Sequence, residues 1–448
     1  MILYKSFLQV TKKISLTSLG KFLSFPLNLV NLFLLISIFD KEIFAIFIFL
    51  EAVVGVISAG LFSSQNTILN RYFGDIKDKY SFSVYKQSLY LKIICFFTGT
   101  LILFILHPIL YQIELFKDSK DIFSLLLLCF IYSVSVDLTV FNSYFSISNN
   151  KFKTNFLFQV LISISVFLAL VSVFFLELSL FDFLFLRIII PVVFFISFVF
   201  FFNSFKTDKN IDQSEPFLAF FREIASKQFP LMIGGFLVVL ANFIPSIIFG
   251  VANQVNNLVF WGYLERVFAF PKNGITTIST NLYPLSFKNF SKKVEAELSQ
   301  ELLDNYMTIC LISFAIVIAS PIFYGAYVYI YDQAFLFQEL FIFFIRFFTL
   351  FLIVGMFTSN FIFYSTNSTY RLASLNIINA LIKSLNIFLT SYGLIYVVLI
   401  IFSSYFLPFV YSVTKIKNFL KIRKYLILNA AISTSLVIST SLFYFFFN

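Results

Sequence analysis

Long apolar runs follow one another along almost the whole chain, and short polar segments separate them. A run of roughly 20 apolar residues is long enough to cross a bilayer as an α-helix. The pattern predicts thirteen spans, at 15–38, 42–69, 87–110, 121–145, 154–176, 181–203, 226–250, 256–284, 303–330, 336–363, 370–390, 393–413 and 423–447. No polar segment is long enough for a soluble domain. The predicted fold class is therefore an all-α polytopic membrane protein.

The composition indicates that lipid is the solvent. Of the 448 residues, 60% are hydrophobic and 12% are charged, whereas a soluble domain carries about 25% charged residues. Cys95, Cys129 and Cys310 each lie alone in an apolar run, so they fit neither a metal site nor a disulfide framework. His107 is the one histidine, which excludes a His-based catalytic pair. We expect no metal and no cofactor.

The charges between the spans predict the topology. The net charge is +10, and the connecting segments alternate between a set with twenty-two Lys and Arg residues and a set with three, Lys41, Lys117 and Lys120. Cytoplasmic loops carry the excess of basic residues in membrane proteins. The N-terminus should therefore be cytoplasmic and Asn448 periplasmic. Because topology accounts for the basic residues, nucleic acid is not an expected partner.

A polar stretch divides the spans into two equal groups. Lys206 to Glu215 lies between the sixth and seventh spans, and equal halves joined by a polar linker are typical of transporters built from repeats. We expect two six-helix lobes in a pseudo-two-fold arrangement around a central cavity, plus a thirteenth helix. The predicted divisions are an N-terminal lobe at 1–205, a cytoplasmic linker at 206–221, a C-terminal lobe at 222–415 and the additional helix at 416–448.

Ten charged residues lie more than four residues from either end of a predicted span. The cations are Lys21, Lys92, Arg187, Arg266, Lys272, Arg346 and Lys383, and the anions are Glu51, Asp137 and Glu265. A charge at the centre of a spanning helix costs roughly 2.5–3.5 kcal/mol. The first three cations lie within about two turns of a helix end, where a long side chain can reach the headgroups. The deeper charges either form structural ion pairs or line a hydrophilic cavity.

Three spans carry polar residues along one face, at the roughly 100° per residue of an α-helix. These residues include Lys21, Asn28 and Asn31 on the first span and Glu51, Ser58 and Gln65 on the second. On the eighth span Arg266 and Asn273 share one face, and Glu265 and Lys272 share the adjacent face. Hydrogen bonds between helices can explain one such stripe, but three of them favour a central cavity. Seven cations against three anions make that cavity cationic, so the cargo should carry negative charge, such as a phosphate or pyrophosphate.

Short motifs in both halves resemble those of the multidrug/oligosaccharidyl-lipid/polysaccharide (MOP) flippase superfamily. FDKEIFA at 39–45 resembles the family loop "LGPEEFG", and the second span has a small and polar end, GLFSSQN, at 60–66. In the second half, GYLERVF at 262–268 resembles the family stretch "Y-x-x-A-x-R". The likeness covers residues 15 to about 415. It is strongest to the polysaccharide transporter branch, the Wzx-type flippases of O-antigen and capsule units.

This resemblance implies a flippase rather than an enzyme. Its cargo would be an undecaprenyl-pyrophosphate-linked oligosaccharide, moved by alternating access across the bacterial inner membrane. The candidate cargo-binding residues are Lys21, Asn28, Asn31, Gln65, Arg266, Lys272, Asn273 and Arg346. The anions Glu51, Asp137 and Glu265 would balance charge or couple transport to H⁺ or Na⁺. Membrane lipids, a polysaccharide polymerase and a chain-length regulator are the implied partners.

Three other functions compete with this interpretation. A cation-coupled multidrug antiporter of the same superfamily would use acidic residues for a cationic drug, and Glu51 and Asp137 could serve that purpose. An O-antigen polymerase or ligase would place catalytic residues on a sizeable periplasmic loop, but the outer loops here are about ten residues long or shorter. A scaffold protein would leave the charges inside the membrane unexplained.

Overall fold

The computed structural model describes residues 16–63, 81–117, 121–148, 152–203, 236–287, 295–331, 333–365, 369–390, 393–415 and 420–446. Within these ranges the chain is 93% helical and contains no β-strand. Each of the thirteen predicted spans contains an α-helix in its described part. The apolar pattern therefore predicted the elements correctly, and the fold class is confirmed.

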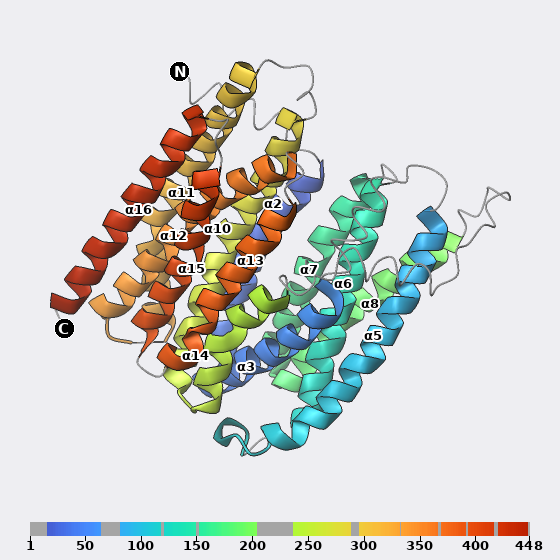
Figure 1. Ribbon diagram of the computed structural model, residues 1–448. Helices are drawn as coiled ribbons and strands as arrows, with labels where there is room; N and C mark the ends of the chain where they lie inside the picture. Colours follow the sequence, from blue (N-terminus) through green and yellow to red (C-terminus); the bar gives the residue numbers. More distant parts are fainter. Residues whose placement is uncertain are drawn as a thin grey trace. The chain divides into compact units, whose positions relative to one another are not determined.

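The described residues of the first half of the chain form six long helices (Figure 1). They are α2 (Leu16–Ile38), α3 (Lys41–Ser58), α5 (Ser81–Leu110), α6 (Ile122–Ser148), α7 (Phe152–Leu176) and α8 (Leu180–Asn203). Asp40 begins α3, because its carboxylate accepts a hydrogen bond of 2.8 Å from the backbone N–H of Ile43. A five-residue π-helix, η1 (Ala59–Ser63), continues α3 at its end.

The second half begins with the helix Phe236–Val251. It continues with α10 (Val255–Phe287), α11 (Glu295–Ile330), α12 (Phe337–Ser365), α13 (Thr369–Ser384), α14 (Asn386–Leu389), α15 (Leu394–Lys415) and α16 (Leu420–Phe446). The predicted span 370–390 is interrupted at Leu385, which separates α13 from α14. The predicted linker, 206–221, lies outside the described residues, so the division of the chain at this linker stays a prediction.

The helices group into two units. The first unit contains 1–25 and 260–448, and the second contains 26–259. One boundary falls at Pro26 inside α2 and the other inside α10. The helix Phe236–Val251 belongs to the second unit, together with α3 through α8, although the polar linker precedes it in the sequence.

Close approaches between helices hold the second unit together. In this unit α6 packs against α3, α5, α7 and α8. Gly99 of α5 lies so close to Phe130 of α6 that an added Cβ would meet the ring at 2.1 Å. Gly55 of α3 meets the ring of Phe243 in the same way. Gly55 has no side chain, so the ring of Phe243 can pack directly on the backbone of α3. This contact helps to hold the helix Phe236–Val251 in the second unit.

In the first unit, α12 packs against α11, α13, α15 and α16, and Figure 1 shows α11, α12 and α16 side by side. The buried side-chain amide of Asn429 in α16 donates hydrogen bonds to the Tyr306 hydroxyl on α11 and to the Phe351 carbonyl on α12, the latter at 3.0 Å. The thirteenth predicted helix is therefore bonded into the unit through buried polar groups.

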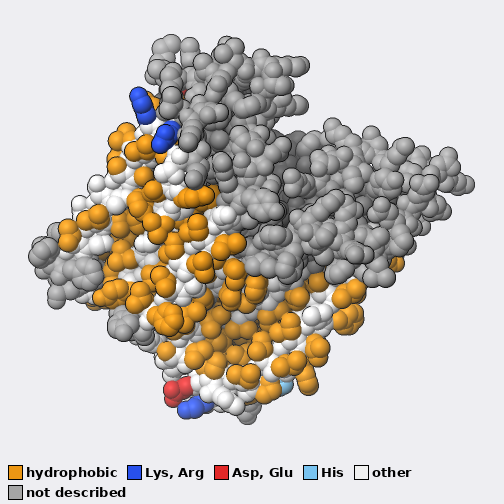
Figure 2. Space-filling model, in the orientation of Figure 1, with side chains coloured by type: hydrophobic (Ala, Val, Ile, Leu, Met, Phe, Trp, Pro, Cys, Tyr) orange, Lys and Arg blue, Asp and Glu red, His pale blue; other side chains and the backbone are white. Residues whose placement is uncertain are grey.

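The surface of the described helices is suited to lipid. Eight described helices are long and apolar enough to cross a membrane. Large apolar side chains such as Phe175, Ile322 and Tyr329 are 75%, 73% and 87% exposed. Figure 2 shows hydrophobic side chains over most of the described part of one face, with Lys, Arg, Asp and Glu near its ends. The chain is a multi-pass membrane protein.

Candidate functional site

The first buried ion pair lies in the second unit and joins α3 to α8. Glu51 accepts a hydrogen bond of 3.0 Å from Arg187, whose guanidinium is only 3% exposed. The guanidinium also lies over the ring of Tyr132, 4.1 Å from its centroid. These contacts fix Arg187 between α3, α6 and α8. Its side chain therefore does not extend to the lipid headgroups.

The second pair joins α5 to α6 in the same unit. The Lys92 ammonium lies 2.5 Å from the Asp137 carboxylate and is 1% exposed. It also contacts the faces of two rings, Phe62 on η1 at 5.5 Å and Phe141 on α6 at 5.2 Å. Lys92, like Arg187, therefore points into the unit and not toward headgroups.

The third pair lies in the first unit and joins α10 to α12. Arg346 donates to both oxygens of Glu265, at 2.5 and 2.8 Å. Its remaining arm donates to the Thr349 hydroxyl at 3.1 Å, and its guanidinium stacks 3.7 Å from the centroid of Phe268. Arg346 is 3% exposed. Three of its five N–H donors thus bond to protein groups in this conformation.

Two lysines and a tyrosine form a charged group together with this third pair. Lys383 of α13 is 1% exposed, and its ammonium lies 3.4 Å from the hydroxyl of Tyr405 on α15. Lys383 interacts electrostatically with Lys272 and Arg346, and Tyr405 interacts with all three cations and with Glu265. We call these five residues the cationic cluster: Glu265, Lys272, Arg346, Lys383 and Tyr405. Its formal charge is +2, because three cations accompany one carboxylate.

The cationic cluster contains three of the sequence-predicted site residues, Glu265, Lys272 and Arg346. Lys383 had been recognised as a charge within a span but not assigned to the site, and Tyr405 had not been identified. A tyrosine has no formal charge, so a search for charged residues inside the spans does not find Tyr405. The signal that could have found Lys383 is its place in the middle of the apolar segment Ile377–Leu389.

The other predicted site residues have varied surroundings. Asn31 is buried and donates a hydrogen bond of 2.9 Å to the Ser163 carbonyl on α7, so it serves helix packing in the second unit. Asn28 is half-buried, and Asn273 is exposed. Arg266 is half-buried and donates to the Gly262 carbonyl of its own helix at 3.1 Å. The side chain of Lys21 and the whole of Gln65 lie outside the described residues.

Taken together, the three intramembrane carboxylates each contact a cation, whereas the cationic cluster retains an excess of positive charge. α10 is a long described helix that is neither among the eight candidate spans nor among the shorter apolar helices, and Glu265, Arg266 and Lys272 lie along it. A surplus of cations in a low-dielectric bundle attracts anionic groups. The cluster is therefore suited to holding an anion such as a phosphate ester.

No family model and no curated protein matches the chain. Solved structures do match its fold. An inward-facing multidrug resistance MATE family transporter of the MOP superfamily is similar with a TM-score of 0.67 and 14% identity, over 89% of this chain and 95% of that one. A MOP superfamily transporter from Pyrococcus furiosus, described as having a binding pocket of reversed polarity, is similar with a TM-score of 0.65 and 14% identity, over 92% of this chain and 96% of that one.

The lipid II flippase MurJ, in an inward closed conformation, is similar with a TM-score of 0.62 and 17% identity, over 96% of this chain and 97% of that one. These neighbours are transporters and flippases and not enzymes. At such low identity the likeness concerns the fold. The chain has the all-helical transporter fold that MATE transporters and the MurJ flippase share.

Proposed function

We propose that this protein is a flippase for an anionic lipid-linked cargo, and specifically for undecaprenyl-pyrophosphate-linked repeat units of O-antigen or capsule. It would move the cargo by alternating access from the cytoplasmic to the periplasmic leaflet of the bacterial inner membrane. The N-terminus would lie in the cytoplasm. A polysaccharide polymerase and a chain-length regulator would act next to it.

The cationic cluster is the observation that carries this proposal. Lys272 and Lys383 come from α10 and α13, and Tyr405 from α15, so one anion at the cluster would contact three helices of the first unit. A pyrophosphate offers several acceptor oxygens and at least two negative charges, which would offset the mutual repulsion of the lysines and Arg346. Hydrogen bonds to charged groups contribute about 1.5–3 kcal/mol each.

The closest competing function is the multidrug antiporter, and the acidic residues argue against it. A cationic drug needs a carboxylate that it can approach. Glu51, Asp137 and Glu265 contact Arg187, Lys92 and Arg346 at 2.5–3.0 Å and are 34%, 13% and 32% exposed. A drug would therefore have to share each carboxylate with a cation or displace that cation. Displacing one partner of such a pair leaves an uncompensated buried charge, which costs about 3–5 kcal/mol.

The test removes positive charge from the cluster. Lys272→Gln and Lys383→Gln should each weaken cargo binding about tenfold, because the loss of about 1.4 kcal/mol corresponds to that factor. Surface polysaccharide should fall and complete lipid-linked repeat units should accumulate, identified by mass spectrometry of membrane extracts. Lys117→Gln is the matched control, since Lys117 is 67% exposed, pairs with Glu114 and belongs to the second unit, whereas the cluster belongs to the first.

A depletion strain distinguishes the two candidate functions. Accumulation of complete repeat units on the cytoplasmic face supports the flippase. Normal glycolipid pools together with increased sensitivity to cationic drugs would instead support the antiporter. Wild-type polysaccharide in both cluster variants, at wild-type protein levels, would contradict the role of the cationic cluster.

A further inference from the structure

Three polar side chains form a buried stripe along α13 and α14, in the first unit. They are Asn379, Lys383 and Asn386, with relative exposures of 4%, 1% and 0%. At the 100° per residue of an α-helix they fall within roughly 60° of one another on the helix surface. The opposite face is apolar and exposed, with Leu381 at 61% and Phe388 at 70%. The polar side of this segment therefore faces the interior of the unit.

The stripe meets α15, against which both α13 and α14 pack. The side-chain amide of Asn379 donates to the Ser404 carbonyl at 2.9 Å, and the Lys383 ammonium lies 3.4 Å from the hydroxyl of the next residue, Tyr405. Lys383 and Tyr405 belong to the cationic cluster. At 1.5 Å per residue, Asn379 lies about 6 Å before Lys383 along the helix axis and Asn386 about 4.5 Å after it. The stripe therefore places an amide on each side of the anion site.

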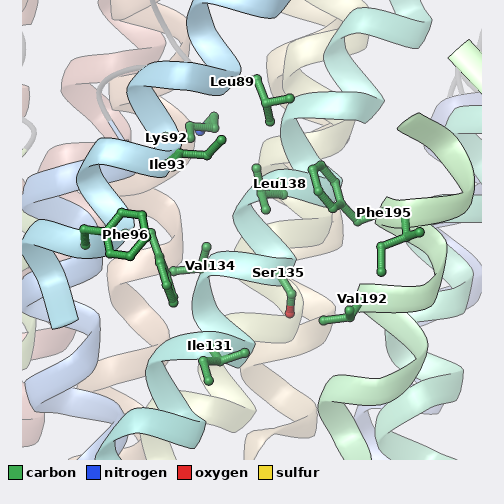
Figure 3. Close-up of a pocket in the computed structure, with 12 residues that line it drawn as sticks. Leu89, Lys92, Ile93, Phe96, Ile131, Val134, Ser135, Leu138, Val192 and Phe195 are labelled. Carbon is green, nitrogen blue, oxygen red and sulfur yellow. The ribbon is translucent and has the colours of Figure 1, made fainter. Parts of the chain in front are cut away.

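Both amides carry buried atoms without a partner. Neither the Oδ1 atom of Asn379 nor the Oδ1 and Nδ2 atoms of Asn386 has a hydrogen-bond partner among the described residues. Lys92 of the second unit shows the contrast, since it lies beside the groove between α5, α6 and α8 (Figure 3) but bonds to Asp137. A buried polar group without a partner is destabilising. The two amides thus point to a partner outside the chain.

The chemistry of the amides indicates what this partner is. A side-chain amide is uncharged and offers both an acceptor oxygen and two N–H donors. The formal charge of +2 at the cationic cluster repels a metal ion, and a second anion gains little from a neutral amide. The hydroxyl groups of a sugar are uncharged and both donate and accept. Because Lys383 lies between the two amides, the sugar must adjoin the bound anion, as it does in a glycosyl pyrophosphate.

The backbone around Asn386 contains the points about which the stripe can open. The Leu385 N–H bonds at 3.1 Å to the carbonyl of Ile382, three residues back and not four, which separates α13 from α14. Gly393, with a φ of 127°, follows α14. Residues at the ends of elements absorb such changes of backbone angle when a segment moves. Movement of α14 away from α15 exposes Asn386, which is 0% exposed in this conformation.

We propose that the side-chain amides of Asn379 and Asn386 bind the first sugar of the cargo, next to the pyrophosphate at the cationic cluster. The inference rests on the proposed function, and it adds a sugar site to the anion site. Lys383 contacts the phosphate oxygens and the amides contact the hydroxyls. All of these residues belong to the first unit.

Two ligands that differ by one sugar test the proposal. The probes are undecaprenyl pyrophosphate and the same lipid carrying one hexose, in competition for the purified protein in nanodiscs, with bound lipid measured by native mass spectrometry. Wild-type protein should prefer the glycosylated lipid by about tenfold or more, because its amides stay unpaired with the bare lipid. Asn386→Leu should lose most of this preference and retain its affinity for the bare lipid. Asn386→Ala should do the same without adding volume.

Thermal stability separates sugar binding from a structural role. Asn386→Leu removes an amide that has no partner among the described residues, so the melting temperature should stay the same or rise. Asn429→Leu is the matched control, because the Asn429 amide bonds to Tyr306 and Phe351 and its loss should lower the melting temperature. A lower melting temperature for Asn386→Leu would assign Asn386 to packing and overturn the inference.

The same ligands separate this inference from the proposed function. Equal affinity of wild-type protein for the two lipids would overturn the sugar site. If Lys383→Gln weakens binding of the bare lipid while Asn386→Leu changes neither affinity, the anion site stands and the sugar site fails. If Asn386→Leu removes the preference while Lys383→Gln leaves the affinity for the bare lipid unchanged, the sugar site stands and the anion site fails.

Discussion

Arg346 and Glu265 form a two-armed ion pair across α10 and α12, with N–O distances of 2.5 and 2.8 Å. The geometry matches the planar fork of the guanidinium to the two carboxylate oxygens, which is the strongest arrangement for this kind of pair. Around it lie the two lysines and the tyrosine of the cationic cluster. The pair therefore stabilises the helices that carry the cluster, and it also sets the charge balance of the site.

Glu265→Gln should destabilise the protein by roughly 3 kcal/mol, because it leaves the buried Arg346 without its counter-charge. The double variant Glu265→Gln/Arg346→Gln should recover part of this loss, since no uncompensated charge remains. Unfolding in an SDS titration, followed by Trp261 fluorescence, measures both. A single variant within 0.5 kcal/mol of wild type would mean that the pair contributes little to stability.

The Lys92–Asp137 pair should show strong coupling in a double-mutant cycle. Asp137→Asn leaves a lysine that is 1% exposed, so it should cost roughly 3 kcal/mol, and Lys92→Met should suppress most of that loss. Lys117 and Glu114 give the matched control, since both are more than half exposed and their nitrogen and oxygen lie 3.2 Å apart. Coupling there should stay below about 1 kcal/mol. Equal coupling in the two cycles would contradict this prediction.

Two helical glycines of the first unit should respond differently to alanine. A Cβ at Gly355 would lie 2.3 Å from the ring of Phe409, whereas nothing lies within 4 Å of a Cβ at Gly325. Gly355→Ala should therefore lower stability by about 1–3 kcal/mol through overpacking of α12 against α15. Gly325→Ala should be neutral or stabilising by up to about 1 kcal/mol, because alanine favours the helix. Thermal melting of the two purified variants in detergent checks the difference in sign.

Single cysteines should reveal the orientation that the loop charges predict. In a background with Cys95, Cys129 and Cys310 replaced by alanine, Lys117→Cys should react with a membrane-impermeant maleimide on intact spheroplasts. Lys424→Cys should react only after the membrane is opened. The opposite labelling pattern would invert the topology, and labelling of both positions from outside would contradict the number of spans between them.

The sequence was sufficient for the helices, because a run of apolar residues long enough for a bilayer leaves few alternatives to helix. The sequence did not show which cation contacts which anion. Glu51 and Arg187 lie 136 residues apart, and Lys92 and Asp137 lie 45 apart, so their contact depends on how α3, α5, α6 and α8 pack. The sequence analysis allowed Lys92 and Arg187 to reach the headgroups, and their ion pairs follow only from the packing.

The candidate site was only partly predictable for the same reason. Lys272 and Arg346 were identified from their depth in the apolar runs. Tyr405 carries no formal charge, and its role depends on α13 and α15 packing side by side, which hydropathy does not report. The π-helix Ala59–Ser63, which presents Phe62 to Lys92, also has no sequence signature that we recognised.

The long separation between Glu51 and Arg187 has a consequence for biosynthesis. A ribosome adds about 5–20 residues per second, so α3 emerges roughly 7–27 s before its counter-charge, given the 136 intervening residues. During that interval a nascent α3 carries a carboxylate that hydrocarbon disfavours. We expect α3 to stay at the insertion channel until α8 arrives, so that α3 and α8 enter the bilayer together.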